Sequence, residues 1–155
     1  MRPGQRPDKA TCERLLYSQF PKGEVPDVGW LVQCLDLFEQ SPLCAEMAAA
    51  AARGQLFHEV PFDVQLPAAR WAVDGDRGPL WLSGRIDALF CDDDGKWVVV
   101  DYKLTKAQAV GELAGTYAKQ LAAYRLALEA AGIGPIGRLG LWLAGSGQAV
   151  WVANS

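Results

Sequence analysis

Residues Leu80–Lys103 read LWLSGRIDALFCDDDGKWVVVDYK. The stretch consists of two apolar runs, rich in residues that favour β-strands, on either side of an acidic turn. The runs are Leu80–Phe90 and Trp97–Tyr102, and a turn that ends in glycine between two such runs is typical of a β-hairpin. We therefore expect two antiparallel strands. If Asp93-Asp94-Gly95 is a three-residue loop with Gly95 in the left-handed conformation, the numbers of paired residues add to a constant.

This register sets Asp87 opposite Asp101. Directly opposed residues point to the same side of the sheet with Cβ atoms about 5 Å apart, where two carboxylates repel each other. A divalent cation, or the loss of one carboxylate, would relieve the repulsion. Strand alternation also predicts Lys103 beside Asp101 and Arg85 beside Asp87 on the same face. A solvated sheet face is the simpler alternative, but the apolar run Trp97–Val100 favours burial, and buried charges need partners.

The hairpin resembles the paired strands of the PD-(D/E)xK nucleases, in particular the nuclease domain at the C-terminus of the RecB and AddA helicase-nucleases. In that family a G-x-I-D strand precedes a D-Y-K strand, as Gly84–Asp87 precedes Asp101–Lys103 here. The family's Q-x-x-x-Y helix motif is matched by Gln120 and Tyr124, and its upstream E-x-P-F-like strand by Glu59–Phe62.

The resemblance covers roughly Leu37 to the C-terminal end and implies an α/β fold. The implied architecture is a mixed central sheet flanked by helices, with a restriction-endonuclease-like αβββαβ core. The implied function is a metal-dependent deoxyribonuclease, exonuclease or endonuclease, of the type attached to RecB/AddA helicases in DNA double-strand break repair and recombination. The implied partners are DNA, as single-stranded ends, and a helicase subunit or fused helicase domain. The alternative is a weak or inactive nuclease-fold domain that binds DNA or a helicase partner.

The resemblance also assigns roles to individual residues. The implied metal ligands are oxygen donors for Mg²⁺, for which Mn²⁺ can substitute: Asp87, Asp101, Glu59 and the backbone carbonyl of Tyr102. The implied catalytic group joins the two aspartates to a lysine and a polar pair: Asp87, Asp101, Lys103, Gln120 and Tyr124. Two basic residues are the candidate DNA contacts: Arg85 and Lys106. An ammonium group such as that of Lys103 can orient the attacking water or stabilise charge on the phosphate.

The only histidine, His58, adjoins Glu59, and neighbours on a strand point to opposite faces, so only one of them can join the site. The motif favours Glu59. The helicase-nucleases that this chain resembles bear a histidine on their first helix, and no histidine precedes His58 here. We therefore expect the sequence to be the end of a larger polypeptide or a free-standing domain. Its activity in isolation should be weak and improved by Mn²⁺.

Composition narrows the remaining possibilities. Half of the 155 residues are apolar, which is typical of one globular domain, and the net charge of −3 requires any DNA contact to be local. The four cysteines show no C-x-x-C spacing and none follows Cys91, so we expect free thiols and neither zinc nor an iron–sulfur cluster. No apolar run is long enough to span a membrane or serve as a signal peptide, and we expect a cytoplasmic protein with no membrane partner.

The chain divides into an arm or linker at residues 1–27 and the nuclease domain at residues 28–155. We expect one helix from Val28 to just before Ser41 and a second, capped by Ser41, from Pro42 to Arg53. The remaining expected elements are an edge strand around Phe57–Val60, a turn within Ala68–Pro79, a loop at Leu104–Gly111, a helix at Glu112–Ala131 and strands at Arg138–Ala144 and Gln148–Ala153. Asp92–Gly95 is expected to be a solvated turn and not a calcium loop.

Overall fold

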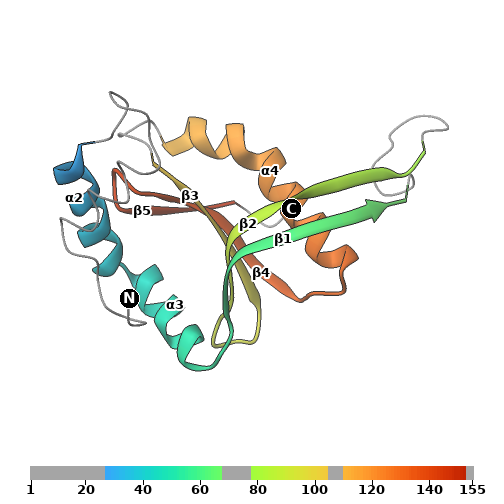
Figure 1. Cartoon of the computed structure of the whole chain (residues 1–155), viewed down its shortest axis with the longest axis horizontal. Coiled ribbons are helices and arrows are strands. Elements are labelled where there is room, and N and C mark those ends of the chain that lie inside the picture. The colour runs from blue at the N-terminus through green and yellow to red at the C-terminus, as the bar shows by residue number, and fades with distance from the viewer. Residues whose placement is uncertain (1–26, 68–77, 105–109, 153–155) are drawn as a thin grey trace.

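The computed structural model describes residues 27–67, 78–104 and 110–152. Within these ranges the elements, labelled as in Figure 1, are α2 (Val28–Glu39), α3 (Pro42–Ala52), β1 (Leu56–Leu66), β2 (Leu80–Cys91), β3 (Trp97–Lys103), α4 (Val110–Ala130), β4 (Ile136–Leu143) and β5 (Gln148–Val152). The five strands form one sheet in the order β1-β2-β3-β4-β5, in which β3 and β4 are parallel and the other neighbours are antiparallel. The predicted mixed sheet flanked by helices is confirmed.

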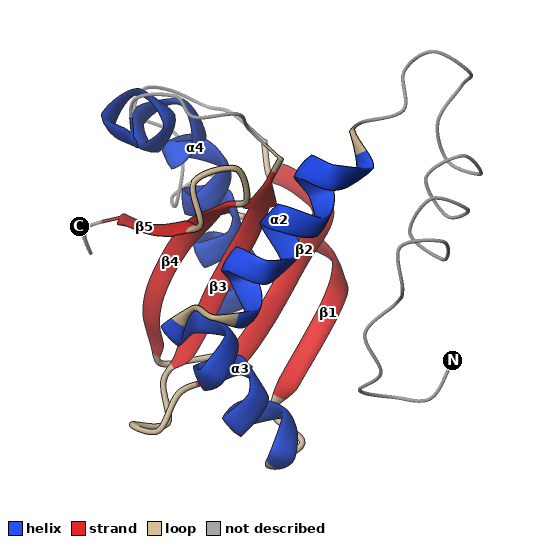
Figure 2. Cartoon of the chain, turned by 90° about the vertical axis from the view of Figure 1, so that its left-hand side faces the viewer, coloured by secondary structure: helices blue, strands red, loops and turns tan. Residues whose placement is uncertain are grey.

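The sheet separates two apolar layers. Helices α2 and α3 cover one face, while α4 covers the other (Figure 2). On the α2/α3 side the buried cluster includes Met47, Phe90 and Trp142, and on the α4 side it includes Leu121, Leu128 and Leu141. Strand β3 contributes to both layers because its alternate valines point to opposite faces.

The central hairpin has the predicted register. Ala88 pairs with Val100 and Cys91 with Trp97, so paired numbers add to 188 as the Gly95 turn requires. Gly95 has φ 75°, and Asp92 Oδ1 accepts hydrogen bonds from the backbone amides of Asp94 and Lys96 at 3.0 and 2.9 Å. The acidic turn is therefore stabilised by the Asp92 side chain.

Helix α3 begins where its capping residue predicts. Ser41 Oγ accepts from the Cys44 amide at 3.1 Å, directly before Pro42 opens α3. Strand β1 extends past the expected Phe57–Val60 run and includes Pro61, which an edge strand tolerates because it has a side without partners. Helix α4 begins two residues before the expected Glu112.

Several sequence predictions fall outside the described residues: the arm at residues 1–26, most of the turn within Ala68–Pro79, and Lys106. The described cysteines, Cys34, Cys44 and Cys91, are free thiols. Among the described helices, none has the length and apolar character needed to cross a membrane.

Candidate active site

The candidate site lies where β2 separates from β3. The β2–β3 ladder ends at the pair Ala88–Val100, one step before Asp87 would pair with Asp101. At that step a side chain takes the place of a backbone acceptor: Asp87 Oδ2 accepts a hydrogen bond from the Tyr102 backbone amide at 2.8 Å. Strand β2 continues with β1 alone, as a two-stranded ribbon that projects from the sheet (Figure 1). The two carboxylates therefore lie together at the base of this fork.

Four side chains from β3 and α4 form a closed polar ring. Lys103 Nζ lies 2.6 Å from Asp101 Oδ2 and donates to Gln120 Oε1 at 3.3 Å. Gln120 Nε2 donates to Tyr124 Oη at 2.8 Å, and Tyr124 Oη donates to Asp101 Oδ1 at 3.1 Å. Every donor in the ring has an acceptor, and the sequence prediction that Gln120 and Tyr124 face the aspartates agrees with this geometry.

The two charged side chains of this ring are largely buried, which strengthens the interactions between them and their neighbours. Asp101 is only 2% exposed, and the Lys103 side chain is 19% exposed. Burial, followed by the nearby Asp101 charge, raises the pKa of Tyr124 well above its usual range, so its hydroxyl remains a donor. Burial also raises the pKa of Tyr102 to about 12.

One carboxylate oxygen of Asp101 is unsatisfied among the described residues. Its Oδ2 is buried and has no hydrogen-bond partner among the described residues, because the Lys103 ammonium approaches as an ion pair without hydrogen-bond angles. The predicted repulsion between Asp87 and Asp101 is present and raises the pKa of Asp87, although burial is the larger cause. Lys103 and the Tyr102 amide oppose that shift. Removing the Asp87 carboxylate would therefore relieve the repulsion, as expected from the sequence. Removing Asp101 would instead leave Lys103 and Tyr124 without their partner.

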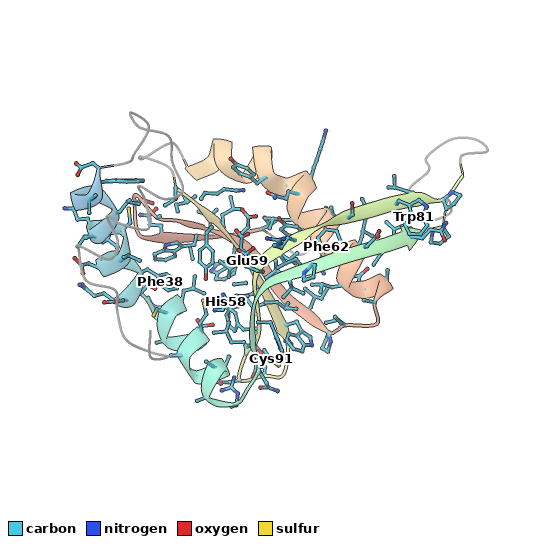
Figure 3. All side chains as sticks on the ribbon, in the orientation of Figure 1. Phe38, His58, Glu59, Phe62, Trp81 and Cys91 are labelled. Atoms are coloured by element: carbon cyan, nitrogen blue, oxygen red, sulfur yellow. The ribbon has the colours of Figure 1, made fainter. Side chains whose placement is uncertain are left out.

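Glu59 occupies an unusual position on β1. Its φ of 53° is left-handed, and the β1–β2 pairing skips the step at which Glu59 would meet Asp87. Figure 3 shows Glu59 at the bend where the ribbon departs. A left-handed conformation is uncommon for a residue with a side chain and stores strain.

The bend shifts the alternation of side chains. Ile86 packs in the same cluster as Leu89, whereas Ala88 and Phe90 belong to the opposite layer. Strict alternation would group Ile86 with Ala88, so the basis for setting Arg85 beside Asp87 on one face is wrong. Arg85 instead forms an ion pair with Glu59 at 3.0 Å, with both side chains more than 60% exposed.

The side chains of the other predicted site residues, Glu59, His58 and Tyr102, point to other partners or to solvent. Glu59 is near enough to raise the pKa of Asp87, but its carboxylate is paired with Arg85. His58 lies exposed opposite Ala88. The Tyr102 ring packs edge-on against Phe38 toward α2, so only its backbone belongs to the site. Among the residues that the structure describes, no three histidine, cysteine or acidic side chains are grouped closely enough to hold a metal ion.

One contact of the site was not predicted. The Lys103 ammonium lies 4.2 Å from the centre of the Tyr117 ring, within cation–π range. Tyr117 lies one turn before Gln120 on the α4 face that also carries Tyr124, and that spacing is the signal that could have indicated it.

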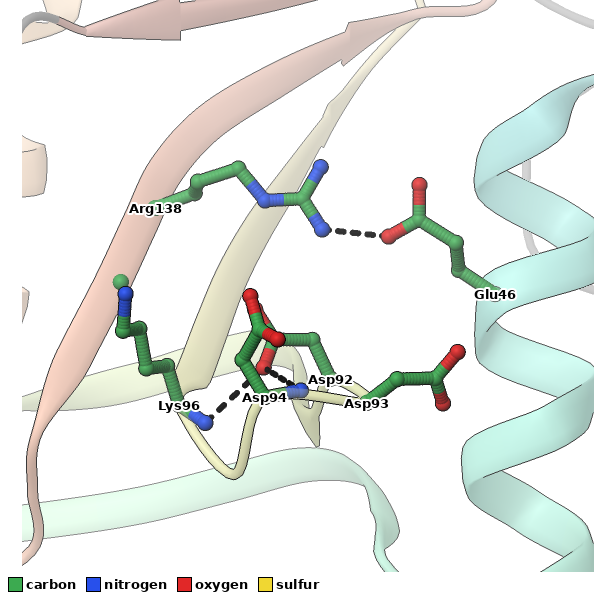
Figure 4. A pocket seen from close by; sticks show the side chains of 7 residues that line it. Glu46, Asp92, Asp93, Asp94, Lys96 and Arg138 are labelled. Carbon is green, nitrogen blue, oxygen red and sulfur yellow. Dashed lines mark hydrogen bonds and ion pairs between the residues drawn. The ribbon is translucent and has the colours of Figure 1, made fainter.

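A charged pocket of about 370 Å³ lies elsewhere, at the hairpin turn. Figure 4 shows Glu46 of α3 paired with Arg138 of β4 above Asp92, Asp94 and Lys96. This pocket is at the opposite end of β3 from Lys103, and none of the predicted catalytic side chains lines it.

A comparison with protein families matches the PD-(D/E)XK nuclease superfamily over residues 2–150. The chain belongs to this superfamily. A comparison with curated proteins gave no match. Members of the PD-(D/E)XK superfamily are generally nucleases and typically use divalent metal ions, which associates this chain with nuclease activity and DNA binding.

The residues of this PD-(D/E)XK site suit a hard divalent cation. Asp87 and Asp101 offer carboxylate oxygens, the ligands that Mg²⁺ prefers, and the buried Asp101 Oδ2 has no hydrogen bond from any residue that the structure describes. Two carboxylates suffice for an ion that keeps several of its waters. Asp87 and Asp101 would therefore hold the metal, and Glu59 and the Tyr102 carbonyl remain candidate ligands.

We expect Glu59→Gly to be more stable than Glu59→Ala by about 1 kcal/mol, because glycine adopts the left-handed conformation without strain. Both variants lose the exposed ion pair with Arg85 equally, so the difference isolates the backbone term. Urea unfolding of the two proteins measures it. Equal stabilities would mean that position 59 is not strained in solution.

We expect Asp87→Asn to raise the free energy of unfolding at pH 7 in the presence of a chelator. The raised pKa of Asp87 means that the folded state binds its proton more tightly than the unfolded state does, so the penalty is absent below the ordinary carboxyl pKa and grows as pH rises. The stability difference between variant and wild type should therefore shrink as pH falls toward 4. A difference that is constant between pH 7 and pH 4 would contradict this.

Proposed function

We propose that this chain is a metal-dependent deoxyribonuclease that hydrolyses phosphodiester bonds in DNA, with Mg²⁺ as the metal and Mn²⁺ able to replace it. The observation that carries the proposal is the buried Asp101, which is tied to Lys103, Gln120 and Tyr124 and lies beside Asp87. Stability alone does not explain a buried charge in a sheet, because apolar residues of similar size stabilise such positions as well or better.

Each residue would have a definable part in the reaction. When bound by Asp87 and Asp101, the metal would polarise the phosphate and lower the pKa of the attacking water. The Lys103 ammonium would stabilise the negative charge that builds on the phosphate oxygens. Tyr124 stays protonated because of its raised pKa and fixes Asp101 Oδ1, and Gln120 orients both Tyr124 and Lys103.

We also propose the RecB/AddA type of nuclease, with single-stranded DNA ends as substrate and a helicase subunit or fused helicase domain as partner. The support is the G-x-I-D, D-Y-K and Q-x-x-x-Y motifs in order, together with the contact between the last two across β3 and α4. An acidic chain would bind an unthreaded strand weakly, which favours delivery of the strand by a partner. A role in double-strand break repair and recombination follows from this type.

We expect Asp101→Asn to lower Mg²⁺-dependent cleavage of end-labelled single-stranded DNA by about 100-fold or more, because it removes a charged ligand. Asp63→Asn is the matched control, since Asp63 is an exposed β1 residue outside the site. Product lengths on 3′- and 5′-labelled strands would give polarity, and a same-sequence RNA would test the preference for DNA. Cleavage by Asp101→Asn at the wild-type rate would overturn the proposed mechanism.

A further inference from the structure

The Lys103 ammonium contacts side chains of two elements, β3 and α4. On its own strand, Asp101 Oδ2 lies 2.6 Å away. On α4, Gln120 Oε1 accepts from it at 3.3 Å, and the Tyr117 ring centre lies 4.2 Å away. The ammonium is therefore held at the same time by the candidate metal ligand Asp101 and by two side chains of α4, Gln120 and Tyr117.

The ammonium lies beside the oxygen that a bound cation would use. Asp101 Oδ2 is buried and accepts no hydrogen bond within the described part of the chain, and it is also the Asp101 oxygen that pairs with Lys103. Two cations close to one carboxylate oxygen repel each other, and their repulsion is weakly screened where water is excluded. A metal ion that binds Oδ2 therefore competes with the ammonium for this oxygen.

We propose that Lys103 is a built-in competitor for the cation at Asp101, and that Tyr117 is the positioning residue that holds the ammonium once the cation has taken Oδ2. This inference rests on the proposed metal-dependent function. Gln120 assists through its amide oxygen, while its amide nitrogen remains bonded to Tyr124. The lysine thereby stays beside the metal site, where its charge is needed, and is not released to solvent.

The face of the Tyr117 ring suits this role better than a second carboxylate would. The attraction between an ammonium and an aromatic face needs no charge on the partner, so it does not compete for the metal. It also does not need the tyrosine hydroxyl. Phenylalanine should therefore replace Tyr117, whereas leucine, which fills similar space without a ring, should not.

The first test is calorimetric titration of the full chain with Mn²⁺. Lys103→Met should bind Mn²⁺ about tenfold more tightly than wild type, as expected when one charge-assisted contact no longer competes. Lys119→Met is the matched control, because it removes an exposed positive charge from α4 outside the ring. Its Mn²⁺ affinity should change by less than about twofold. Lys103→Gln serves as a second variant if the methionine form does not fold.

The second test separates positioning from simple packing. Tyr117→Leu should weaken Mn²⁺ binding severalfold, because the ammonium then has no aromatic face to occupy once the cation has taken Oδ2, and Tyr117→Phe should retain the wild-type affinity. In the Lys103→Met background, Tyr117→Leu should have no effect on Mn²⁺ binding, since no ammonium remains to be held. A loss of the same size in both backgrounds would show that Tyr117 acts only as packing, and would overturn its role.

The outcomes distinguish this inference from the proposed function. If wild type binds no Mn²⁺ at Asp87 and Asp101, both fail. If wild type binds Mn²⁺ and cleaves DNA, but Lys103→Met binds no more tightly, the competitor role is wrong and the proposed function stands. Thermal unfolding without metal confirms that each variant is folded before the titrations are compared.

Discussion

A carboxylate buried on a central strand must be matched by partners, and Asp101 imposes this constraint on the whole structure. It lies on β3 with β2 on one side and β4 on the other. Strand β3 supplies the ion pair from Lys103, and α4 supplies the hydroxyl of Tyr124. Helix α4 must therefore keep one face against this end of the sheet. The apolar contacts of Leu121 and Leu128 hold it there.

The site has a buried part around Asp101 and a partly exposed part at Asp87. Asp101, Lys103, Gln120 and Tyr124 share a helix–sheet interface in which every donor is matched. Asp87 is different, because β2 has already left β3 at its position and its carboxylate bonds to the Tyr102 amide. Where the two strands diverge, Asp87 is partly exposed, whereas Asp101 remains buried. Preorganised charges of this kind are what catalysis of charge-forming reactions requires.

Much of this arrangement could be predicted from the sequence, for reasons that are local. The Gly95 turn sets the hairpin register, and that register alone brings Asp87 level with Asp101. The four-residue spacing of Gln120 and Tyr124 sets them on one helix face, and their direction follows from the apolar stripe beside them.

The parts that could not be predicted depend on tertiary structure. The left-handed Glu59 has no local signal, because glutamate rarely adopts that conformation and neither neighbour requires it. Its bend shifts the alternation of the ribbon, which is why Arg85 meets Glu59 and why period-two reasoning failed there. The contact between Lys103 and Tyr117 depends on how α4 crosses the end of β3, which the sequence does not specify.

We infer that Asp87 and Asp101 together hold a divalent cation. The most direct measurement is a crystal structure of the chain with Mn²⁺, with the ion located by its anomalous scattering. We expect one strong peak in contact with both carboxylates, with the Lys103 ammonium moved away from Asp101 Oδ2. A peak confined to the acidic turn at Asp92–Asp94, with the Lys103–Asp101 ion pair unchanged, would contradict it.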